Sequence, residues 1–138
     1  MESAVVNRTY HIRRADESEL DRVGEIARQA WQRIHESYQK IIGKEMHCDI
    51  CANWEADKET QVRRHWENHP DWFRVVESIE TRQVVGFITF RVDSAKSMGI
   101  IGNNAVAPEA QGNGIGTIMY NYVLEVFRER GLKYASVT

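Results

Sequence analysis

A short segment with three alternating glycines constrains the fold of this chain more than any other. Before it, residues 99–106 are rich in β-branched and apolar side chains and predict a strand, which Pro108 ends. After it, residues 115–127 place apolar side chains at helical spacing and predict an amphipathic helix capped by Gly131. The glycines between them are Gly112, Gly114 and Gly116. The sequence therefore predicts a strand, a tight turn and a helix in succession.

Such a turn is suited to binding an anion. Glycine lets the backbone approach a ligand closely, the first amides of a helix lack internal acceptors, and the helix dipole favours negative charge there. We therefore expect phosphate or pyrophosphate at this turn. The alternative is a connection in which the glycines serve only packing. Three alternating glycines between a strong strand and a strong helix favour the binding interpretation.

Two common nucleotide-binding motifs do not fit the turn. A Walker P-loop requires Gly-Lys followed by Ser or Thr, whereas Thr117 and Ile118 follow Gly116. A Rossmann fingerprint requires a third glycine at position 117 and an acidic residue about 20 residues later. Residues 132–136, which occupy that place, include no acid.

The remaining elements alternate between helical and strand patterns. A capping box at residues 16–19 predicts the start of a helix over 17–35, and residues 36–69 favour one or two further helices that Pro70 ends. Strands are predicted over 9–15, 72–79, 84–92 and 132–137. With no repeat, linker or low-complexity segment, residues 1–138 predict a single domain.

Composition excludes several classes of protein. The 138 residues carry a net charge of -2, whereas a sequence-independent nucleic-acid binder shows a basic excess. No apolar run approaches the ~20 residues that span a bilayer, and residues 1–6 lack the layout of a signal peptide. The 2 cysteines do not form a secreted disulfide framework. A cytoplasmic protein with no nucleic-acid or membrane partner is therefore expected.

Residues 104–117 resemble the acetyl-coenzyme A motif of the GNAT superfamily of N-acetyltransferases, which reads roughly Val-x-Pro-x-x-Gln/Arg-Gly-x-Gly-x-Gly/Ala. The order of the predicted elements agrees with this family along the whole chain. The resemblance implies an α/β fold with a central, mostly antiparallel mixed sheet flanked by helices. It also implies transfer of an acetyl group from acetyl-coenzyme A to a primary amine of an unidentified acceptor.

The resemblance further implies two sets of cofactor contacts. The backbone pairing with the pantetheine arm would come from Asn104, Ala105 and Val106. The pyrophosphate would bind to the amides of Gly112, Asn113, Gly114, Ile115, Gly116 and Thr117, with Gln111 at its border. The Val106 N–H is then the candidate to polarise the thioester carbonyl.

A proton acceptor for the amine is not assigned by the sequence. An alkylamine with a pKa near ~10.4 must lose a proton before attack. Some family members place an acid where this chain has Asn103 and Asn104, and neither side chain is a base. Glu77 is a further candidate, but a solvated carboxylate is the favoured interpretation. A non-catalytic acyl-coenzyme A binding or regulatory module is therefore the alternative function.

Family members usually continue beyond the strand at 132–138 with another helix and two strands. We therefore expect a chain that lacks this C-terminal part, either as a truncated fragment or because another chain completes the sheet. An uncovered last strand favours pairing with another chain, as in a homodimer.

A second motif comes near the spacing of a Cys₂His₂ zinc finger. Its residues are Cys48, Cys51, His65 and His69. Residues 52–59 favour helix and contain no glycine, and Glu55 stands where a finger has an aromatic residue, so no zinc site is predicted. Trp31 is predicted to lie in the core. For Trp54 and Trp66, packing and lining of an acceptor pocket are equally favoured.

Overall fold

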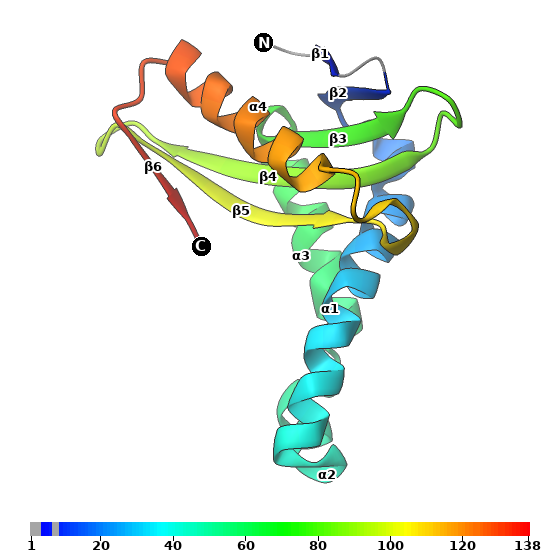
Figure 1. The fold of residues 1–138 in the computed structure, drawn as a ribbon. Coiled ribbons are helices and arrows are strands. Elements are labelled where there is room, and N and C mark those ends of the chain that lie inside the picture. The colour runs from blue at the N-terminus through cyan, green and yellow to red at the C-terminus, as the bar shows by residue number, and fades with distance from the viewer. Residues whose placement is uncertain (1–3, 7–8) are drawn as a thin grey trace.

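The computed structural model describes residues 4–6 and 9–138. Residues 1–3, the first half of the segment compared with a signal peptide, lie outside the described residues. The chain forms a six-stranded sheet in the order β1 to β6 (Figure 1). The strands are β1 Ala4–Val6, β2 Tyr10–Arg14, β3 Phe73–Ser78, β4 Val84–Asp93, β5 Met98–Val106 and β6 Tyr134–Val137. Neighbouring strands are antiparallel except β5 and β6, which are parallel. The predicted mixed, mostly antiparallel sheet is confirmed.

Helices cover both faces of this sheet. They are α1 Leu20–Ile42, α2 Lys44–Cys51, α3 Trp54–Asn68 and α4 Ile115–Glu129. Figure 1 shows α4 on one face, and α1 and α3 on the other, with α2 at the end of the helical pair that extends away from the sheet. Among the described residues, no helix combines the length and the apolar character that crossing a membrane requires.

The first long helix extends further than the apolar pattern predicts. The predicted capping box is present: the Glu19 carboxylate accepts a hydrogen bond from the Asp16 N–H at 2.8 Å. However, α1 continues past residue 35 to Ile42, where Gly43 ends it with a φ of +85°. Residues 36–42 contain no glycine or proline, so helix propensity carries α1 beyond the part that packs on the sheet.

Each face of the sheet buries its own apolar core. The α4 face includes Ile88, Phe90, Met119 and Phe127. The opposite face packs α1 and α3 against β3 and β4 through residues such as Ile26 and Val62. Trp66 packs against this second core, and its indole N–H donates to the Ala15 carbonyl at 3.2 Å.

The prediction that Trp31 lies in the core is wrong. Its side chain is only half-buried, and the Lys58 Nζ atom lies 4.0 Å from the centroid of its ring. At 3.6 residues per turn, Trp31 lies beside the helical face that buries Ile26 and Ala27 rather than at its centre, and it borders a cavity.

The contact between Gly99 and Phe127 sets how closely α4 packs on β5. A Cβ atom placed on Gly99 would lie 2.4 Å from the Phe127 ring, which is well inside van der Waals contact. The absence of a side chain thus lets the C-terminal part of α4 lie directly on the start of β5.

We predict that Gly99→Ala destabilises the fold by about 1–3 kcal/mol, because the added methyl overpacks the interface with Phe127. Urea unfolding measures the change. Gly116→Ala is the matched control, since a Cβ there meets no atom within 4 Å. Equal stability of the two variants would contradict this account of α4 packing.

Candidate functional site

One edge of β5 is open over the residues where the sequence predicts cofactor contacts. The register of β5 with β6 covers Met98–Ile101, and the Thr138 N–H then donates to the Ile101 carbonyl at 3.0 Å. Among the described strands, none continues this pairing along residues 102–106. β5 thus has a backbone edge available to a ligand.

The hydrogen-bond register decides which amides face this edge. The Ala107 N–H donates to the Val85 carbonyl at 2.8 Å, and Ala105 lies opposite Phe87. In an antiparallel pair the direction of the backbone groups alternates, so the N–H groups of Asn104 and Val106 point away from β4. The geometry therefore favours Asn104 and Val106 for backbone contacts with a ligand, whereas the Ala105 N–H points toward β4.

A β-bulge bends β5 just before the open edge. Ile88 lies opposite Asn104, but Phe90 lies opposite Ile101, so residues 102 and 103 together face Thr89. The Thr89 hydroxyl donates to the Asn103 carbonyl at 2.9 Å and stabilises the irregular backbone. Such bulges bend a strand and increase its twist, which here separates β5 from β6.

The glycine turn connects β5 with the N-terminus of α4. Gly112 and Gly114 have φ values of +85° and +77°, which glycine adopts without strain. Gly116 has no positive φ, and a Cβ at any of the three glycines meets no atom within 4 Å. No protein atom therefore packs closely against these glycines, and the space beside Gly116 is open.

The predicted amides are available at this turn. The first helical hydrogen bond of α4 runs from the Ile118 N–H to the Gly114 carbonyl at 3.1 Å, so the amides of residues 115–117 precede the helical ladder. Two side chains close the turn: Asn113 Nδ2 donates to the Ala110 carbonyl at 3.0 Å, and Gln111 Nε2 to the Val106 carbonyl at 3.3 Å. The turn and the open edge are thereby held together.

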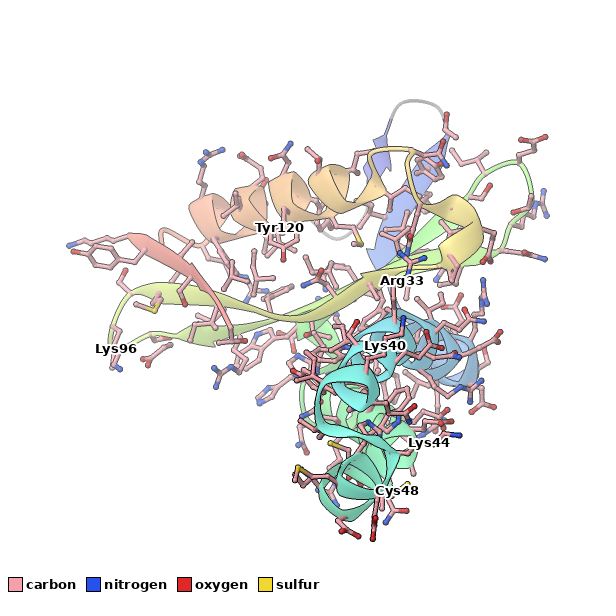
Figure 2. The ribbon with its side chains drawn as sticks, turned by 60° about the horizontal axis from the view of Figure 1, so that its bottom comes forward. Arg33, Lys40, Lys44, Cys48, Lys96 and Tyr120 are labelled. Carbon is pink, nitrogen blue, oxygen red and sulfur yellow. The ribbon has the colours of Figure 1, made fainter. Side chains whose placement is uncertain are left out.

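A cavity of about 580 Å³ lies between α1 and the open edge. Its lining includes Asn104, Val106 and Gln111 from the predicted set, together with Gln29 and Arg33 of α1. The Gln29 Oε1 atom is buried without a hydrogen-bond partner. Figure 2 shows Arg33 between α1 and the turn after β5. A ligand with amide donors and a negative charge would complement both groups.

A second cavity, of about 490 Å³, lies on the α1 and α3 side of the sheet. Its lining includes Trp31, Lys58, His65 and Asn103, and it shares Asn104 with the first cavity. The two cavities therefore approach each other at Asn104. The Asn104 amide is itself held, because its Nδ2 donates to the Gly102 carbonyl at 2.9 Å and the Tyr120 hydroxyl at 3.1 Å.

Two basic groups in the second cavity have pKa values below their ordinary range because of burial. Lys58 Nζ donates to Asn103 Oδ1 and Gln61 Oε1, each at 3.1 Å, and burial lowers its pKa. Burial also lowers the pKa of His65. The His65 Nε2 lies 3.1 Å from the Phe90 carbonyl and 3.3 Å from that of Trp72. Since both neighbours only accept, Nε2 carries the proton and neutral His65 has its lone pair on Nδ1.

The expectation of a solvated Glu77 is wrong. Its carboxylate is half-buried and lies 2.7 Å from the Arg13 guanidinium, which also contacts Glu19 at 2.6 Å. This ion pair links β3 to β2 and to the capping box. The Glu77 carboxylate is therefore engaged by Arg13, and Glu77 lines neither cavity.

The four residues with near zinc-finger spacing have separate surroundings. His65 contacts two backbone carbonyls, His69 stacks on Trp72 with ring centroids 3.8 Å apart, and Cys48 is exposed. Cys51 instead lies beside two histidines outside this motif, His35 and His47.

Sequence reasoning missed most of the groups that line the cavities. These are Gln29, Arg33, Lys58, Gln61 and His65. All come from the helices α1 and α3, where only His65 belongs to a motif, and that motif pointed to zinc rather than to this cavity. The change from an apolar to a polar stripe along α1 was the available signal, since it shows where the helix leaves the sheet.

Comparison with known proteins places this geometry in a family. Residues 21–138 match the model of the family described as the acetyltransferase (GNAT) family. No curated protein sequence matches the chain.

Solved structures share the fold at low sequence identity. One is the PaiA N-acetyltransferase of Thermoplasma acidophilum in complex with coenzyme A, with a TM-score of 0.69 and 16% identity over 90% of this chain and 75% of that one. Another is a GNAT family acetyltransferase of Brucella melitensis in complex with acetyl-CoA, with a TM-score of 0.60 and 18% identity over 93% and 74% of the two chains.

We predict that Gly116→Leu weakens coenzyme A binding at least about tenfold, or about 1.4 kcal/mol, because the side chain covers the amides at the start of α4. Isothermal titration measures the affinity. Stability should stay within about 0.5 kcal/mol, since no protein atom contacts the new Cβ.

Asn121→Leu provides the matched control, since it adds the same side chain at an exposed position of α4 beyond the turn. Unchanged binding by Gly116→Leu would rule out the turn as the pyrophosphate site.

Proposed function

Because the chain belongs to the GNAT acetyltransferase family, we propose that it transfers an acetyl group from acetyl-coenzyme A to a primary amine. The observation that carries this proposal is the meeting of two cavities at Asn104. One extends along the open edge of β5 toward the glycine turn, and the other contains basic groups of lowered pKa. A cofactor and an acceptor can thus reach one point of β5 from different sides.

The first cavity and the glycine turn that follows its lining residue Gln111 fit coenzyme A. The amides of residues 112–117 and the nearby Arg33 would hold the pyrophosphate. The backbone of Asn104 and Val106 would pair with the pantetheine amides, and the orphaned Gln29 Oε1 would accept from an amide N–H of the same arm. The bound cofactor supplies the acetyl group as a thioester.

The outward-facing N–H of Val106 is positioned for the oxyanion-type role. Its direction is fixed by the antiparallel register with β4, so it needs no reorganisation when charge develops on the carbonyl oxygen. The Gln111 side-chain amide donates to the Val106 carbonyl at 3.3 Å and thereby holds the last residue of β5 in place.

Two groups of the second cavity favour the deprotonated, nucleophilic form of the amine. Neutral His65 can accept a proton at Nδ1, and its lowered pKa keeps it neutral at pH 7. Lys58 places a positive charge in the same cavity, which disfavours the protonated form of an acceptor amine. Among the residues that line this cavity there is no carboxylate side chain, so His65 is the base that we assign.

We predict that His65→Gln lowers kcat by about 10²-fold or more and leaves the affinity for acetyl-coenzyme A unchanged, as loss of a general base does. Release of free thiol with a panel of primary amines measures turnover. The matched control is His69→Gln, because His69 is an exposed residue on the same segment that stacks on Trp72.

The pH dependence separates a base from a structural residue. Protonated His65 cannot act as a base, so the wild-type advantage over His65→Gln should be full at pH 7–8 and decrease as the pH falls below the ordinary value of 6.5. A ratio independent of pH would exclude this role. Tight binding of acetyl-coenzyme A without turnover of any amine would instead favour the non-catalytic module.

A further inference from the structure

A cluster of potential metal-binding side chains lies toward the far end of the helical pair, outside the lining of both cavities of the transferase site. His35 comes from α1, and His47 and Cys51 come from α2. Their ligand atoms all lie within 4.8 Å of one another. Figure 2 shows the exposed neighbour Cys48 on α2 in this region of the molecule.

The separation of the ligand atoms is close to that required by one ion. His35 Nδ1 and His47 Nε2 lie 3.0 Å apart. A tetrahedral zinc ion with Zn–N of about 2.0–2.1 Å and Zn–S of about 2.3 Å separates its ligand atoms by about 3.3–3.6 Å. Small rotations of the two rings would therefore admit an ion between the nitrogens.

Neighbouring groups already orient both rings. His47 is 3% exposed, and its second ring nitrogen, Nδ1, lies 3.4 Å from the Gln39 amide, so its Nε2 is directed toward His35. The His35 ring stacks on Trp54, with centroids 4.1 Å apart and planes 13° apart. A His47 that binds metal through Nε2 carries its proton on Nδ1, and the Gln39 side chain supplies an acceptor for it when its amide is turned so that the oxygen faces the ring.

The donor set selects the class of metal. Two imidazoles and a thiolate suit zinc and other borderline or soft transition metals, whereas Mg²⁺ and Ca²⁺ prefer oxygen donors. The protein supplies three ligands, and a cavity of about 500 Å³ borders His35 and Cys51, so a fourth position is open to water or a small ligand.

We infer that His35, His47 and Cys51 form a zinc site with an open fourth position. The site joins the end of α1 to α2 and thereby fixes the turn at Gly43. Its cavity shares Trp31, Lys58 and Gln61 with the proposed acceptor cavity, so bound zinc also restrains one wall of the acceptor site. The zinc site itself does not depend on the proposed acetyl transfer.

Metal binding by the full chain tests this inference. The chain is kept reduced, stripped of metal with a chelator, and titrated with Zn²⁺ against a chromophoric competitor. We expect one equivalent of tightly bound zinc, a thiolate charge-transfer band with Co²⁺, and a rise in melting temperature on adding Zn²⁺.

Two variants identify the ligands. Cys51→Ser and His35→Gln alter half-buried positions, and circular dichroism confirms that they are folded. Each should weaken zinc binding at least about tenfold, because the loss of a group that only orients a ligand already costs about that much. Cys51→Ser should also abolish the cobalt charge-transfer band. The matched control Cys48→Ser changes an exposed cysteine of the same helix and should bind zinc like the wild type.

Three results would overturn the inference. One is a folded wild-type chain that takes up no zinc. The second is equal affinity in the wild type, Cys51→Ser and His35→Gln. The third is an equal loss in Cys48→Ser, which would place the metal on the pair of cysteines instead.

Discussion

The open edge of β5 is the feature on which the rest of the site depends. β5 pairs with β4 along most of its length, whereas its pairing with β6 covers only Met98–Ile101. The bulge opposite Thr89 bends the strand, and the close packing of Phe127 on Gly99 places α4 across it. As a result, unpaired strand amides and unpaired helix amides occur at the same end of the sheet. Backbone geometry alone thus creates a polar, preorganised surface.

Side chains then divide the surroundings of this edge into two environments. The cavity toward the turn contains Arg33 and the unsatisfied Gln29 oxygen, which complement an anionic ligand with amide groups. The cavity on the other side contains Lys58 and His65, whose pKa values are lowered by burial. Burial disfavours the charged form of both groups, and in the proposed reaction this keeps His65 neutral and able to accept a proton at pH 7. Asn104 is the point where the environments meet.

Much of this architecture was predictable from local sequence. β3, β4, β5 and α4 have strong periodicity, and three glycines mark the turn, so the fold class and the proposed pyrophosphate site follow from short-range rules. The lengths and contacts of the helical pair do not. Trp31, Lys58 and His65 meet only because α1 and α3 pack together over a long sequence separation, and the ion pair of Glu77 with Arg13 likewise joins distant strands. The metal cluster was missed because spacing paired Cys51 with His65 and His69 rather than with His35 and His47. The cytoplasmic location, the missing C-terminal part and the homodimer stay predictions.

Amide hydrogen exchange of the full chain, with and without coenzyme A, tests the open-edge account most directly. Exchange reports individual backbone N–H groups, which are the groups to which the account assigns binding. It predicts that the cofactor protects the amides of Asn104 and Val106 together with those of residues 112–117, and leaves Ala105, already directed toward β4, unchanged. Binding of coenzyme A with no added protection at Asn104, Val106 and the turn would contradict it.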